Sequence, residues 1–123
     1  MPTHVPRPAR VEAAGNIEKV IDEYVGPVAT GHHALSVARM RSPAGWTEPG
    51  QTPEFDEFTV VLAGRLNVKS ASGSRDVTAG HAVIAHAGEW VQYSTPDAEG
   101  AEYVAVCLPA FSAATAHRDE GTD

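Results

Sequence analysis

GWTEPGQTPEFDEFTVVLAG, residues 45–64, and GHAVIAHAGEWVQYST, residues 80–95, decide the fold of this chain. Both stretches hold β-branched and aromatic runs that stop at glycine, which is typical of short strands joined by tight turns. In the first, five residues separate Gly45 from Gln51-Thr52-Pro53, three more precede Glu57, and six precede Gly64. Glycine suits tight turns because it adopts positive φ without strain.

The second stretch has a spacing of its own. Five residues separate Gly80 from His86-Ala87-Gly88, two precede Val91, and three precede Thr95. His81 and His86 are expected to be turn residues at the rim of the fold. The two stretches together form a frame of glycines and strand-length runs.

Outside this frame the chain continues the same pattern. Alternating or β-rich runs occur at 33–40, 55–62, 65–70, 75–78 and 102–108. Turn signals recur every eight to ten residues, with Ala63-Gly64 and Ser72-Gly73-Ser74 predicted as hairpin turns. This is the pattern of an all-β meander, and small β-barrels close such a meander to remove its edges.

The two ends differ from the centre. Residues 1–29 are predicted to be an N-terminal arm, proline-rich over 1–15 and either loose or an added edge strand. Its segment 16–25 fits a short helix or turn better than a strand, with Ile17, Val20, Ile21 and Tyr24 at helical spacing. The barrel is assigned to 30–110 and a tail to 111–123, with Phe111 packed back on the barrel.

Composition limits the function classes. The chain has 123 residues, which suits one domain, and a net charge of −7. An acidic chain without a lysine or arginine cluster is poorly suited to nucleic acid, where binding rests on phosphate neutralisation. There is one cysteine, no leader-like apolar segment near Met1 and no run long enough to span a membrane. We expect a cytoplasmic protein with no membrane or nucleic-acid partner.

The frame over residues 45–95 resembles the two conserved motifs of the cupin family, which implies a single-domain antiparallel β-barrel of the jelly-roll type. Asp56-Glu57 before the first turn and the ending Cys107-Leu-Pro-Ala-Phe-Ser are similar to small bacterial cupins, in particular the ethanolamine-utilisation type, over about residues 45–112. Cupins commonly form homodimers, so a homodimer is expected.

In cupins that bind metal, two histidines, a glutamate and a third histidine hold one divalent ion. The corresponding positions here are Gln51, Pro53, Glu57 and Val91, so only Glu57 remains a strong ligand. Proline and valine side chains cannot ligate, and an amide oxygen suits hard ions. No tightly bound metal cofactor is expected, although a divalent ion on an altered ligand set stays open.

The motif positions also predict a pocket. Period-two alternation places Gln51, Glu57, Thr59, Val91 and Tyr93 on the inner face. Glu57, Tyr93 and Gln51 are the candidate catalytic residues: a carboxyl with a raised pKa, a phenol for an oxyanion and an amide for a carbonyl. Glu57 equally fits a structural hydrogen bond, and Tyr93 fits core packing. The candidate substrate-binding residues are Glu48, Trp46, Thr59, Val91 and Arg39.

Three functions remain open at this level. The first is a metal-independent enzyme, an isomerase, cyclase or lyase, that moves protons on a small molecule through Glu57. The second is a module that binds a small molecule without chemistry. The third is a metalloenzyme that uses Gln51, Glu57 and a neighbouring histidine.

Overall fold

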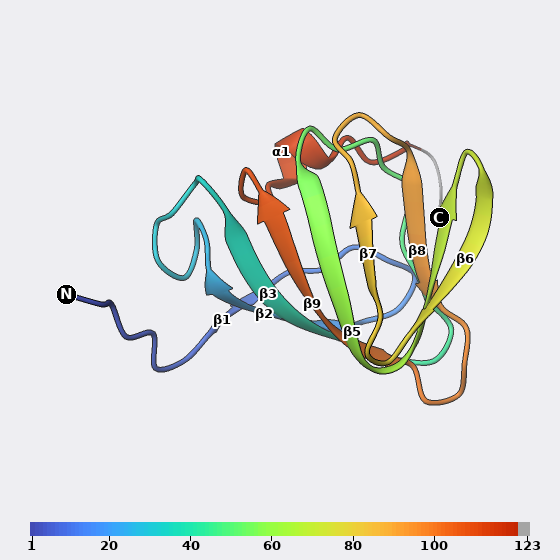
Figure 1. The fold of residues 1–123 in the computed structure, drawn as a ribbon, viewed down its shortest axis with the longest axis horizontal. Helices are drawn as coiled ribbons and strands as arrows, with labels where there is room; N and C mark the ends of the chain where they lie inside the picture. Colours follow the sequence, from blue (N-terminus) through green and yellow to red (C-terminus); the bar gives the residue numbers. More distant parts are fainter. Residues whose placement is uncertain (121–123) are drawn as a thin grey trace.

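A computed structural model describes residues 1–120, and these form one curled antiparallel sheet with almost no helix (Figure 1). All nine strands pair in antiparallel fashion in the order β1-β2-β3-β9-β5-β8-β4, with β6 and β7 also paired to β5. The elements are β1 Ala9–Val11, β2 Val20–Val25, β3 Ser36–Ser42, β4 Trp46–Thr47, β5 Asp56–Ser70, β6 Gly73–Thr78, β7 Ala82–Ala85, β8 Val91–Thr95, β9 Ala101–Leu108 and α1 Ala113–Ala116. The all-β prediction is confirmed.

Strand β5 links the two parts of the sheet. Its first half pairs with β7 and β9, and its second half, from Arg65, pairs with β6 and β8. The hairpin predicted at Ala63-Gly64 is therefore wrong, because the strand runs on through these residues. A register shift between Val61 and Ala63 and a positive φ of 76° at Gly64 bend the strand instead of reversing it.

The core lies inside the curl, and period-two alternation decides which residues reach it. On β8 and β9 the odd-numbered side chains are buried and most of the even-numbered ones are not. Glu57, Thr59 and Val61 follow the same rule on β5, whereas Val60 and Leu62 are 45% and 50% exposed on the other face. The predicted inner face of β5 and β8 is confirmed.

The helix or turn predicted over 16–25 is wrong, because residues 20–25 form β2. This strand pairs with β1 on one side and β3 on the other, so two neighbours favour strand over the helical spacing of its apolar residues. Ile21 and Glu23 border the interior, while Asp22 forms ion pairs with Arg10 and Arg41. The N-terminal arm thus supplies an edge strand, β1.

The tail returns across the open end of the sheet. Phe111 contacts Phe55 edge-on, with ring centroids 5.6 Å apart, as predicted. Backbone hydrogen bonds join Thr115, His117 and Asp119 to the segment 50–54. Residues 121–123 of the predicted tail lie outside the described residues.

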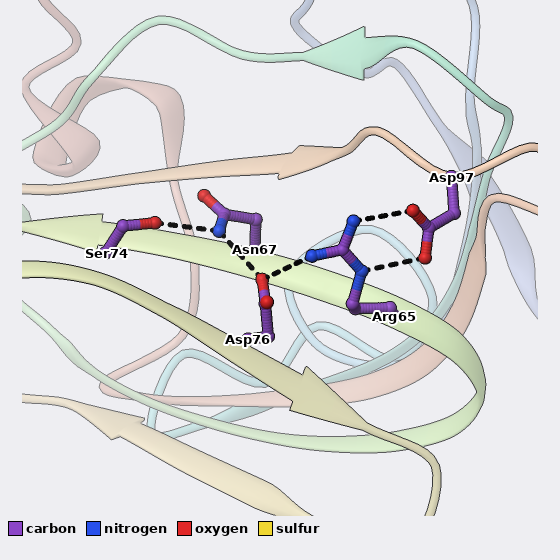
Figure 2. Close-up of polar contacts among 5 residues, drawn as sticks. All are labelled: Arg65, Asn67, Ser74, Asp76 and Asp97. Carbon is purple, nitrogen blue, oxygen red and sulfur yellow. Dashed lines mark hydrogen bonds and ion pairs between the residues drawn. The ribbon is translucent and has the colours of Figure 1, made fainter.

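A polar network fixes the turn before β9 to the bend of β5 (Figure 2). The Arg65 guanidinium donates to both carboxylate oxygens of Asp97, at 2.7 and 2.5 Å, and forms an ion pair with Asp76 at 2.7 Å. Asn67 adds hydrogen bonds to Asp76 and Ser74. Bidentate pairing of this kind fixes orientation as well as distance.

No helix within residues 1–120 is long and apolar enough to cross a membrane.

Candidate functional site

A cavity lies inside the curled sheet, with walls from β1, β2, β3, β5, β8, β9 and the tail. Its volume is about 60 Å³. On the same measure one water molecule needs about 10–15 Å³, so the space holds several waters or a small organic group. Of the predicted site residues, those that border it are Trp46, Glu48, Gln51, Glu57, Thr59 and Tyr93.

Glu57 is a buried carboxyl in this wall, with 8% of the residue exposed. Tyr93 Oη donates a hydrogen bond to its Oε1 at 3.2 Å, and within residues 1–120 no hydrogen bond reaches Oε2. Burial raises the pKa of Glu57, partly offset by the charge of Lys19, the Tyr93 hydrogen bond and the charge of Arg118. Burial also raises the pKa of Tyr93 well above its ordinary value, so the phenol stays protonated.

Glu48 follows β4 and brings a second carboxyl to the cavity. Its backbone N–H donates to Tyr93 O at 3.3 Å, while its Oε2 is buried with no hydrogen-bond partner among the described residues. Burial raises the pKa of Glu48 to about 7; the charge of Lys19 opposes the shift and that of Glu57 adds to it. Such a group changes protonation near neutral pH.

This pKa makes stability depend on pH. The pKa of Glu48 rises from 4.5 to about 7 on folding, so the folded state holds the proton more tightly than the unfolded state. Proton binding at Glu48 therefore stabilises the fold. This stabilisation is complete below pH 4.5 and is lost as pH rises through about 7. Between about pH 4.5 and pH 8, wild type should lose on the order of 2 kcal/mol more unfolding free energy than Glu48→Gln. Urea unfolding at both pH values measures it, with Glu99→Gln, at an exposed carboxyl in the turn before β9, as control. An equal pH dependence in wild type and Glu48→Gln would contradict it.

Lys19 is a site residue that the sequence did not point to. Its Nζ donates to Tyr103 Oη at 2.9 Å and lies 3.9 Å from the centroid of the Trp46 ring. Burial lowers the pKa of Lys19 to about 8, opposed by the charges of Glu48 and Glu57, so the ammonium form predominates at neutral pH. Strand alternation of Lys19 with Ile21 and Glu23 could have revealed it, had residues 16–25 been taken as a strand.

Arg118 is the second cation that the sequence did not point to. The backbone of Arg118 bridges to that of Gln51, which holds the tail against the cavity. Its guanidinium lies 5.3 Å from the centroid of the Phe111 ring, and its Nε is buried with no partner among the described residues. The cavity wall therefore carries two cations and three carboxyls, those of Glu23, Glu48 and Glu57.

Two predicted binding residues lie elsewhere. Arg39 does not reach the cavity: it forms an ion pair with Glu102 on the outer face, because Ala38 and Met40 take the inward positions of β3. Val91 is 3% exposed and packs in the hydrophobic core, away from the cavity wall. Trp46 is 1% exposed and serves both core and cavity, with its Nε1 donating to Ala14 O at 3.2 Å.

The donors at the cupin metal positions do not suit a transition metal. Gln51 and Glu57 border the cavity, but Val91 packs in the core and Pro53 has no donor atom on its side chain. Within residues 1–120 no three His, Cys, Asp or Glu side chains come close enough to share a metal ion. His81 and His86 are exposed, and the cations Lys19 and Arg118 border the same cavity.

Comparison with solved structures places the fold. The chain superposes on the polyketide cyclase RemF of Streptomyces resistomycificus with a TM-score of 0.71 at 15% identity, covering 88% of this chain and 78% of that one. Streptomyces PAC13 with uridine gives 0.73 at 14% identity, covering 95% and 88%. The Clostridium difficile EutQ protein gives 0.62 at 22% identity, covering 77% and 66%. At these identities the likeness concerns the fold.

One protein of known name is similar in sequence. Over 101 residues, 82% of this chain, it is 39% identical to a Myxococcus xanthus protein named endoribonuclease YbeY. The match spans 34% of that protein, so about two thirds of it has no counterpart here. No family model matches the chain. The glycine frame, the two-part sheet around one cavity and these structural likenesses together establish that the chain has the cupin fold.

Proposed function

We propose that this chain is a small-molecule enzyme that moves protons without a tightly bound metal, as an isomerase, cyclase or lyase, with Glu57 as acid and base. One observation carries the proposal: Glu57 is a buried carboxyl on a cavity, with Oε1 held by Tyr93 and Oε2 without a hydrogen-bond partner among the described residues. Burial raises the pKa of Glu57, which makes this carboxyl a better proton acceptor than an exposed glutamate.

The neighbouring groups divide the remaining work. The hydroxyl hydrogen of Tyr93 points at Glu57, so Tyr93 positions the carboxyl. Lys19 supplies a positive charge in a largely apolar surrounding, where it stabilises an oxyanion or enolate that forms as a proton leaves carbon. Gln51, 3% exposed and on the cavity wall, orients a carbonyl. Trp46 and Thr59 shape the wall.

The comparisons support a small-molecule role in a limited way. RemF is named a polyketide cyclase, and the PAC13 structure contains uridine, so proteins of this fold act on or bind small organic molecules. The name endoribonuclease belongs to a protein of which this chain matches about a third, and it leaves open which part carries that activity. An acidic chain with a small cavity supports a small molecule over RNA as the ligand.

The test is turnover of a substrate found by screening aromatic and aliphatic carbonyl compounds, with uridine among the probes. Wild type and Glu57→Gln are compared on the first compound converted. Wild-type rates in Glu57→Gln would contradict the proposal. A compound that binds tightly and is released unchanged by wild type would indicate a binding module instead.

The metal-free part of the proposal has its own measurement. Protein purified without added metal is expected to contain less than about a tenth of an equivalent of any transition metal, because the donor set at Gln51, Pro53, Glu57 and Val91 lacks the required ligands. Elemental analysis measures it. A near-stoichiometric metal content that Glu57→Gln abolishes would favour a metalloenzyme on an altered ligand set.

A homodimer is part of the proposal, with a second copy of this chain as the occupant of one apolar face. The outer face of β7, β5 and β9 carries a continuous apolar surface in paired register, where Phe58 lies opposite both Ile84 and Val106 and Val60 opposite Val104. Val60 and Ile84 are 45% and 53% exposed. A chain of this length buries only about two thirds of its surface, so a self-complementary sheet face gains from pairing.

We therefore expect dimeric wild type and monomeric Ile84→Lys in sedimentation-velocity experiments, because a charge at the centre of the apolar face must lose its water in the dimer. Val28→Lys is the matched control, since Val28 is 65% exposed in the loop after β2. A monomeric wild type, or dimeric Ile84→Lys, would contradict this interface.

A further inference from the structure

Two polar atoms in the cavity wall lack partners and differ in kind. Glu48 Oε2 is an acceptor and Arg118 Nε is a donor, and both are buried without a hydrogen bond within residues 1–120. Buried polar groups are nearly always paired, with protein, water or ligand. The charge of Arg118 lowers the pKa of Glu48, yet no hydrogen bond joins the two side chains within residues 1–120. A ligand that reaches both would satisfy both.

The cavity wall carries charged groups of both signs. Lys19 and Arg118 are both cationic at neutral pH. Burial raises the pKa of Glu48 to about 7, so that carboxyl is only partly ionised at neutral pH, and burial also raises the pKa of Glu57. Glu23 is a third carboxyl at the cavity, and its Oε2 accepts hydrogen bonds from the backbone N–H groups of Val28 and Ala29. With three carboxyls in the wall, a ligand with a single negative charge is favoured over a dianion.

The rest of the wall is suited to a compact organic body. The Trp46, Tyr103 and Phe111 side chains border the cavity together with Cys107 and several alanines. Such a mixture of apolar walls with a few convergent polar groups is the usual composition of a small-molecule site. Arginine recognises a carboxylate through N–H groups in a fixed plane.

We propose that the cavity binds a small organic acid whose carboxylate accepts a hydrogen bond from Arg118 Nε and whose hydroxyl or amino group donates to Glu48 Oε2. This inference rests on the proposed function in placing the ligand in the same cavity. It specifies the class of substrate, a hydroxy or amino acid, and it holds for binding whether or not Glu57 converts the ligand.

Thermal unfolding with defined probes tests it. The probes are the sodium salts of L-lactate, 3-hydroxybutyrate and 4-hydroxybenzoate at about 20 mM, each beside its neutral amide and the acid that lacks the hydroxyl, with sodium chloride as reference. A ligand at about ten times its Kd should raise Tm by about 3 °C or more for a domain of this size. We expect at least one acid to raise Tm by this amount. The neutral amide of that acid should hardly change Tm, and the acid that lacks the hydroxyl should raise Tm less.

Variants assign the two contacts. Arg118→Gln should remove the preference for acid over amide, and Arg118→Lys should retain part of it, because lysine keeps the charge without the planar N–H group. Arg75→Gln, which removes an exposed arginine on β6, is the matched control and should bind as wild type does. Glu48→Gln should reduce only the advantage of the hydroxyl group.

The inference is overturned if no acid raises Tm above the chloride reference, if an amide is as effective as its acid, or if Arg118→Gln keeps the full preference. The proposed function fails in a different way. Unchanged turnover in Glu57→Gln with an intact acid preference rejects Glu57 as acid and base but leaves the ligand class standing. Impaired turnover in Glu57→Gln without a preference for acid over amide supports Glu57 as acid and base but rejects the proposed ligand class.

Discussion

Glu57→Gln is expected to lower kcat by about 10²–10⁴-fold on any substrate that the enzyme converts, the usual contribution of a positioned general acid or base. Glutamine keeps the size of the side chain and still accepts the hydrogen bond from Tyr93 Oη, but it cannot take up a proton. The loss should therefore fall on kcat, with KM and the unfolding midpoint little changed. Glu54→Gln makes the same change at an exposed carboxyl three residues earlier and is the matched control.

The pH profile separates this role from a structural one. Burial raises the pKa of Glu57, so the limb of kcat/KM that reports this carboxyl should lie above pH 4.5 and vanish in Glu57→Gln. The Tyr93 hydrogen bond lowers the pKa of Glu57, so Tyr93→Phe should move that limb to still higher pH. A profile unchanged in both variants, with full turnover, would leave Glu57 as a structural acceptor for Tyr93.

The site divides into a part that the sequence predicted and a part that it did not. Gln51, Glu57 and Tyr93 lie inside the glycine frame, where spacing and period-two alternation place each side chain on a known face. Lys19 and Arg118 lie outside that frame. Their place depends on tertiary pairing: β2 lies between β1 and β3, and backbone hydrogen bonds join the tail to residues 50–54. The local sequence pattern does not predict such tertiary contacts.

Arg39 shows the limit of the same reasoning within a strand. The sequence made it a candidate substrate-binding residue. The alternation of β3 explains why Arg39 points outward: Ala38 and Met40 are its apolar members and take the inward positions. The two cations of the cavity wall are Arg118, from the tail, and Lys19, which lies immediately before β2.

Gly64→Ala is expected to lower the free energy of unfolding by about 3–5 kcal/mol, a large share of the stability of a small domain. Gly64 has a φ of 76°, a conformation that costs other residues about 1–2 kcal/mol. An added Cβ would also lie 2.1 Å from Gly100 O and 2.9 Å from the Cα of Ala101. Both are backbone atoms where the chain enters β9, so a side-chain rotation cannot relieve the clash and the backbone itself would have to move.

The clash is held in place from two sides. Gly100 itself lies against the backbone of Ser42, where a Cβ would meet the carbonyl oxygen at 2.1 Å. The Arg65–Asp97 pair fixes the same turn to the strand immediately after Gly64 (Figure 2). Movement of this turn away from an alanine at position 64 therefore disturbs β3, β9 and the ion pair together, which adds backbone strain to the cost of the positive φ.

Gly45→Ala separates the two contributions. Its φ of 79° matches that of Gly64, but nothing lies within 4 Å of the added Cβ. Denaturant unfolding should show a loss of about 1–2 kcal/mol for Gly45→Ala, from φ alone, and a clearly larger loss for Gly64→Ala. Equal losses would mean that the bend of β5 relaxes freely. Equal losses are what a hairpin turn at residues 63–64 would give, as the sequence alone predicted. A continuous strand packed against β9 should give the larger loss for Gly64→Ala.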